Sequence, residues 1–120
     1  MTLFEMWARA RPFIEPAIPE LKGTHTIDDV TLMLGAGMLR LWLWPRSALL
    51  TEITLTPRVK ALNCFLGGGD LDELRRMEAE QLVPFAKANG CNRITGGGRK
   101  GWKRVLPGYE CGGIYMHKDI

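Results

Sequence analysis

Hydrophobic and polar residues alternate along the middle of this chain, and the alternation predicts strands. In the first segment Leu39, Leu41 and Leu43 would face one side of a sheet, with Arg40 and the tryptophans on the other. Short turns containing proline separate the segments, which is typical of neighbouring antiparallel strands. We therefore predict a three-stranded meander over Met38–Trp44, Ala48–Leu55 and Val59–Leu66.

Elsewhere the apolar residues recur at the spacing of an α-helix, in three segments. These are Thr2–Ile14, the segment from Ile27 to Leu34, and Leu71–Ala88. Thr26 and Asp70 precede the second and third segments as N-caps, and Glu73 lies at capping-box spacing from Asp70. Prolines break the pattern after the first helix, and Pro84 should kink the third because it removes a backbone hydrogen bond.

The stretch from Lys60 to Arg99 organises the fold. Its strand ends at Leu66, a turn over Gly67–Gly69 follows, and the long helix leads to a strand over Cys91–Thr95. A strand, a crossover helix and a second strand form a parallel unit. Beyond it the sequence predicts a short helix and a closing strand, over Gly101–Leu106 and Cys111–His117. The fold class is therefore α/β (α+β): a mixed sheet with helices on both faces, in a single domain 1–120 whose residues 1–25 form a helical cover.

Composition narrows the picture without naming a partner. The chain has 120 residues, of which 46% are hydrophobic and 24% charged, and its net charge is +3, so a wholly disordered chain is excluded. No apolar run reaches the roughly 20 residues that a membrane helix needs. The three cysteines form no CxxC pair and the two histidines are isolated, which argues against a metal site and favours buried thiols in a reducing cytoplasm.

The order of these elements resembles the central and C-terminal part of the GNAT superfamily of N-acetyltransferases, over residues 26–120. The segments AKANGCNRI and GGRKGWKRVLPGYE are similar to small GNAT-like proteins encoded by bacteriophages and prophages. Four segments carry the resemblance: Lys60–Gly69 as strand and phosphate-binding turn, Asp70–Gly90 as helix, Cys91–Thr95 as parallel strand, and Trp102–Tyr109 as short helix and Gly-Tyr pair.

The resemblance implies an acetyl-CoA-dependent N-acetyltransferase that acts on an amine, in the cytoplasm of a bacterial host. It implies Glu52 as the general base that removes a proton from the amine. The cofactor-binding residues would be Phe65, Leu66, Gly67, Gly68, Gly69, Asp70, Arg99 and Trp102.

Each of these roles has a structural alternative. The three glycines either cradle a pyrophosphate or make a tight strand-to-helix turn. Glu52 is either a base or an exposed strand carboxylate, and Trp102 either stacks on a ligand or fills the core beside a solvated basic helix. Trp42 and Trp44 either line a groove or, as we expect, are buried under the N-terminal helix.

Two other functions stay open. In the family the turn carries a basic or amide residue before spaced glycines, whereas this chain has Gly67–Asp70. That departure favours a catalytically inactive GNAT-like protein that a phage uses for binding or assembly with a phage or host protein, including in the virion. The basic segment Arg93–Arg104 favours, less strongly, a nucleic-acid-binding protein. A homodimer is compatible with each of these functions.

Overall fold

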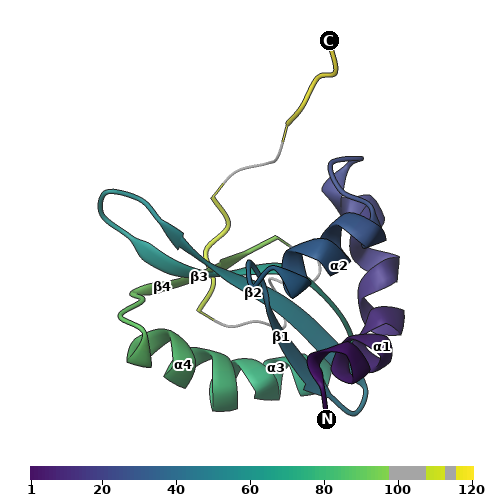
Figure 1. Ribbon diagram of the computed structural model, residues 1–120. Coiled ribbons are helices and arrows are strands. Elements are labelled where there is room, and N and C mark those ends of the chain that lie inside the picture. Colours follow the sequence, from purple (N-terminus) through teal and green to yellow (C-terminus); the bar gives the residue numbers. More distant parts are fainter. Residues whose placement is uncertain (98–107, 113–115) are drawn as a thin grey trace.

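A four-stranded mixed sheet with helices on both faces makes up the fold in the computed structural model, which describes residues 1–97, 108–112 and 116–120 (Figure 1). The strands are β1 (Arg40–Trp44), β2 (Ser47–Leu55), β3 (Lys60–Gly69) and β4 (Arg93–Gly96). The first helices are α1 (Leu3–Ile14), the 3-10 helix η1 (Glu15–Leu21) and α2 (Ile27–Gly35). The crossover helix consists of α3 (Leu71–Met77), a π-helical turn η2 (Glu78–Leu82) and α4 (Val83–Ala88).

The strands follow the order β1-β2-β3-β4 in the sheet. β1, β2 and β3 are antiparallel neighbours, which confirms the predicted meander. β3 and β4 are parallel, from the pair Ala61–Arg93 to the pair Cys64–Gly96. The predicted strand–helix–strand unit is therefore confirmed, and the mixed sheet follows from it.

The predicted turn over Gly67–Gly69 is wrong, because these residues are the end of β3. They pair with Leu49, Ala48 and Ser47 of β2. A Cβ atom on Gly68 would overlap the carbonyl oxygen of Phe13, and Gly69 has a φ of 107° and lies against the carbonyl of Arg46. The glycines thus let the end of α1 and the β1–β2 turn approach the strand closely.

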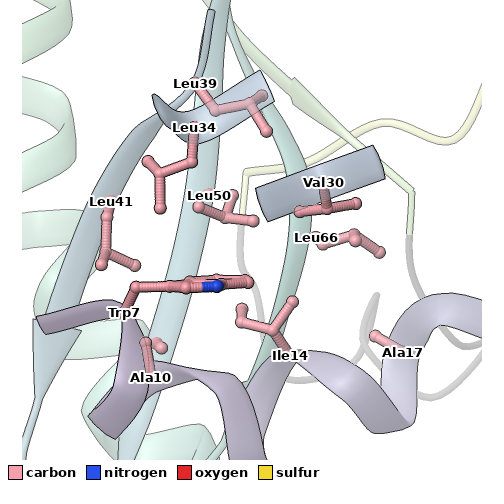
Figure 2. Close-up of a cluster of buried hydrophobic side chains, with 11 residues drawn as sticks. Trp7, Ala10, Ile14, Ala17, Val30, Leu34, Leu39, Leu41, Leu50 and Leu66 are labelled. Atoms are coloured by element: carbon pink, nitrogen blue, oxygen red, sulfur yellow. The ribbon is translucent and has the colours of Figure 1, made fainter. Parts of the chain in front are cut away.

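One face of the sheet packs against α1 and α2. The core there includes Trp7, Ile14, Val30, Leu50 and Leu66, each at most 4% exposed (Figure 2). The indole nitrogen of Trp7 donates a hydrogen bond of 3.0 Å to the hydroxyl of Thr31, which joins the two helices. The predicted N-cap of α2 is confirmed, because Thr26 and Asp29 form a reciprocal capping box.

The opposite face packs against the crossover helix through Leu62, Met77, Leu82 and Ala86. Trp42 and Trp44 lie on this face, so the expectation that the N-terminal helix buries them is wrong. The alternation along β1 explains the result, since the leucines that α1 covers point to the other side. Both tryptophans are half-buried, and the indole nitrogen of Trp44 donates a 2.9 Å hydrogen bond to Gln81.

The crossover helix is continuous through Pro84. The backbone N–H of Val83 donates to the carbonyl of Glu78, five residues earlier, which makes the turn before the proline π-helical. We predicted a kink at Pro84, and the structure has a wider, π-helical turn just before it. Pro84 has no N–H to donate, which explains why the regular helix is interrupted here. Gly90, with a φ of 74°, ends the helix as predicted.

The elements predicted for the C-terminal part fall only partly within the described residues, and none of those residues confirms them. The helix predicted for Gly101–Leu106 lies outside them. Within the strand predicted for Cys111–His117, Cys111, Gly112, Met116 and His117 are in no strand, and the other three lie outside the described residues. These four are exposed, and Cys111 is therefore not the buried thiol we expected. In the described part of the chain no helix is long and apolar enough to cross a membrane.

Candidate functional site

The strands β3 and β4 separate after the pair Cys64–Gly96, and β3 alone continues to Gly69. Among the described residues, no strand pairs with this last part of β3 on the β4 side. A pocket of about 360 Å³ lies against Gly67–Gly69. Its other walls come from α1, η1 and α3, through Phe13, Pro16, Leu71 and Leu74 among others. An unpaired strand edge beside apolar side chains can bind an extended ligand that carries amide groups.

A β-bulge lies where the two strands separate. Leu50 pairs with Leu66 and Thr51 with Cys64, so Phe65 is the extra residue of β3. A bulge bends its strand and increases the local twist. The β3–β4 pairs end one residue before the bulge, and the pocket lies beside the part of β3 that follows it.

The sequence-predicted cofactor residues fall into three groups. Gly67, Gly68 and Gly69 line the pocket. Phe65 is half-buried, with its ring 5.3 Å from that of His25, and the side chain of Leu66 is 4% exposed in the core. The side chain of Leu66 therefore contributes packing rather than ligand contact. Arg99 and Trp102 lie outside the described residues.

Asp70 is bound by its own protein at the start of α3. Its carboxylate accepts a 3.0 Å hydrogen bond from the backbone N–H of Glu73 and lies 3.6 Å from the guanidinium of Arg46. Its own N–H donates to the carbonyl of Arg46 at 2.8 Å. Asp70 therefore acts as the predicted N-cap, and with Asp72 it places negative charge where a helix would otherwise attract an anion.

Glu73 is a buried carboxylate that the sequence indicated only as a capping residue. It is 6% exposed and accepts three hydrogen bonds, from the Ser47 hydroxyl at 2.7 Å, the Arg46 N–H at 2.9 Å and the Arg46 side chain at 3.1 Å. Burial raises the pKa of Glu73. The hydrogen bonds from Ser47 and Arg46 and the charge of Arg46 together lower the pKa by more than burial raises it, so the pKa lies below its usual value. The carboxylate is therefore ionised and joins the β1–β2 turn to α3.

Glu52 lies on β2 in a different hollow of the sheet. It is half-buried and lines a groove of about 640 Å³ together with Leu3, Met38 and Ile53 among others. Its carboxylate accepts a hydrogen bond of 3.4 Å from the side-chain amide of Asn63, the residue opposite it on β3. The structure therefore does not place Glu52 in the pocket of the three glycines, although both adjoin β3.

The pKa of Tyr109 is affected by Glu78, a residue of the crossover helix. Burial, and then the charges of Glu78 and Cys64, raise the pKa of Tyr109 to about 12. Burial and the charge of Glu78 likewise raise the pKa of Cys64 to about 11. Both groups are therefore protonated at neutral pH, and the structure brings together three residues that no sequence motif connects.

The described residues contain no group of three or more His, Cys, Asp and Glu side chains that could hold a metal ion.

Comparison with known proteins identifies a structural class and nothing narrower. No protein-family model matches the chain, and no curated protein sequence does. Two crystal structures of TTHA1254 from Thermus thermophilus are similar to it, a point mutant with a TM-score of 0.53 and the wild type with a TM-score of 0.51. In both comparisons the identity is 15%, and the match covers 92% of this chain and 95% of that chain. At this identity the likeness shows a shared mixed α+β fold alone.

Proposed function

We propose that this protein is a GNAT-fold N-acetyltransferase that binds acetyl-CoA in the pocket beside the end of β3, where no strand of the described residues pairs with β3 on the β4 side. One observation carries the proposal. The pairing of the parallel strands β3 and β4 ends next to a bulge, and a pocket of about 360 Å³ is lined by Gly67–Gly69 beyond it. The resemblance in residues 26–120 supports the family, and the similarity to phage-encoded proteins supports a phage origin.

The pocket suits the amide-bearing arm of the cofactor. An extended chain with amide groups can pair with a free strand edge as an added strand would. Leu71 and Leu74 provide apolar walls on one side, and Pro16 and Ala17 on the other. The carboxylates of Asp70 and Asp72 disfavour phosphates at the start of α3, so we assign this pocket to the arm and place the phosphates outside it.

Bound acetyl-CoA would supply a thioester. As the amine attacks its carbonyl carbon, a C–N bond would form, the C–S bond would break, and CoA would leave as a thiolate that takes a proton from solvent. In this chain, backbone N–H groups of β3 would polarise the carbonyl oxygen of the thioester. The amine would approach from the groove that Glu52 lines, which adjoins β3 but is separate from the glycine pocket, and the Glu52 carboxylate would accept the proton that the amine loses. The remaining contribution is orientation, since holding amine and thioester together removes most of the entropic barrier.

Calorimetry with three ligands tests the proposal: acetyl-CoA, S-acetylpantetheine, which lacks the nucleotide, and ADP. We expect acetyl-CoA and S-acetylpantetheine to bind and ADP to bind far more weakly. Leu71→Trp fills the pocket and should weaken acetyl-CoA binding by at least about tenfold, equivalent to roughly 1.4 kcal/mol. Leu32→Trp, on the exposed face of α2, is the matched control and should change nothing. No binding of acetyl-CoA to the wild type at about 1 mM would exclude the proposal.

A specific observation favours a second function, a catalytically inactive GNAT-like protein used for binding or assembly. Asp70 caps α3 and pairs with Arg46, so the protein itself occupies the helix terminus that a pyrophosphate would need. Purified protein that carries no CoA and acetylates none of a panel of amines would support this function. The nucleic-acid-binding alternative stays a prediction, because most of Arg93–Arg104 lies outside the described residues.

A further inference from the structure

A row of three polar side chains crosses the sheet next to the point where β3 and β4 separate. Glu52 of β2 lies opposite Asn63 of β3, and Asn63 lies opposite Thr95 of β4. Only the pair Cys64–Gly96 lies between this row and the part of β3 that no described strand pairs with on the β4 side. The row therefore connects the carboxylate assigned as base to the strand that borders the separation.

The hydrogen bonds run in one direction along the row. The hydroxyl of Thr95 donates to Oδ1 of Asn63 at 2.9 Å, and Nδ2 of Asn63 donates to Oε1 of Glu52 at 3.4 Å. The amide therefore presents its NH₂ group to Glu52 and its oxygen to Thr95. A flipped amide would place two acceptor oxygens together. In the described part of the chain, Asn63 is the one hydrogen-bond donor to the Glu52 side chain.

We propose that Asn63 is the positioning residue for Glu52 and that Thr95 holds Asn63 in the required orientation. This inference rests on the proposed function, in which Glu52 accepts the amine proton. The amide occupies Oε1 and leaves Oε2 to take that proton. A carboxylate held at one oxygen loses less freedom when it reacts than one that rotates freely, so the row should affect kcat more than the binding of acetyl-CoA.

Kinetics of matched variants test the positioning role. Asn63→Leu keeps the branched skeleton of the side chain and removes the donor, and Thr95→Val does the same for the hydroxyl. We expect Asn63→Leu to lower kcat by about tenfold or more and Thr95→Val by a few fold, with KM for acetyl-CoA within about twofold of wild type. Thr95→Ser keeps the hydroxyl and should retain the wild-type kcat. Unchanged kcat in both Asn63→Leu and Thr95→Val would overturn the inference.

The pH dependence separates positioning from a structural role. Asn63→Asp keeps the shape but faces Glu52 with a second carboxylate, which disfavours ionisation of the pair. The acid limb of its kcat/KM profile should therefore move to higher pH. Arg40 also lines the groove and is the other charged residue of its described lining. If the row served only the stability of the fold, Asn63→Asp would be less stable but the acid limb of its kcat/KM profile would not move.

A measurement on the ligand-free protein distinguishes failure of the inference from failure of the proposed function. The Asn63 side-chain NH₂ signals in a ¹H–¹⁵N spectrum should move as pH falls and Glu52 becomes protonated. They should not move in Glu52→Gln. Signals that do not change with pH in the wild type overturn the positioning contact. A wild type whose signals move but that transfers no acetyl group overturns the proposed function alone.

Discussion

The hydroxyl of Ser47 donates a 2.7 Å hydrogen bond to the carboxylate of Glu73, and this contact joins the first residue of β2 to the first turn of the crossover helix. Both residues are buried, at 0% and 6% exposure. Arg46 completes the set with its backbone N–H and its guanidinium. Because α3 forms a wall of the pocket, this buried contact also sets the position of that wall.

Removing the Ser47 hydroxyl should destabilise the fold. Ser47→Ala deletes a buried hydrogen bond to a charged group, which is worth about 1.5–3 kcal/mol. Urea denaturation would measure the loss, and a double-mutant cycle with Glu73→Gln would assign it. A loss of the same size in the Glu73→Gln background would show that the pair does not interact.

The contribution of Glu73 to stability should depend on pH in the acid range. Its folded-state pKa is below the unfolded value, because the hydrogen bonds from Ser47 and Arg46 outweigh the effect of burial. The stabilisation is therefore fully present above the unfolded pKa, about 4.3, and is lost as pH falls through the lower folded pKa. The stability difference between wild type and Glu73→Gln should stay constant from pH 7 to about pH 5 and narrow below about pH 4. Denaturation at a series of pH values measures it, and a constant difference down to the folded pKa would contradict the assignment.

Gly68 should not tolerate a side chain. Gly68→Ala places a methyl group on the carbonyl oxygen of Phe13, and backbone atoms cannot move aside as the end of a side chain can. Overpacking of this kind costs about 1–3 kcal/mol. Gly97→Ala is the control, because no atom of the described residues lies within 4 Å of its added Cβ. Thermal denaturation of the two variants would test the difference, and equal melting temperatures would refute it.

The three cysteines should differ in their reaction with iodoacetamide. Burial and the charge of Glu78 raise the pKa of Cys64 to about 11, so little of it is thiolate at pH 8. Cys111 is exposed and should react much sooner. Mass spectrometry of a time course would show modification at Cys111 first and at Cys64 last. In denaturant the difference should disappear, and its persistence there would mean that the fold does not cause it.

The local patterns of the sequence predicted much of the fold. The alternation in Met38–Trp44 and its two neighbours predicted β1, β2 and β3, and Thr26 and Asp70 were correctly predicted as helix caps. The parallel pairing of β3 and β4 followed from the single helix between them. These features depend on residues close together in the chain, so the sequence displays them directly.

The sequence predicted less of the candidate site than of the fold. Three consecutive glycines suit a turn, an anion-binding loop or a closely packed strand equally well. The carbonyl of Phe13, from a helix far away in the sequence, shows that they are a closely packed strand end. The burial of Glu73 had no local signal either, because its partners Arg46 and Ser47 belong to another turn.

The amino-acid sequence by itself determined the helices and strands, their caps and the mixed character of the sheet, because periodicity and backbone propensity act over a few residues. Only the tertiary structure decided that β3 continues through its glycines, that the tryptophans of β1 face the crossover helix, and that Glu52, Asn63 and Thr95 form one row. Those outcomes depend on strand register and on packing between distant segments, which no local pattern of residues contains.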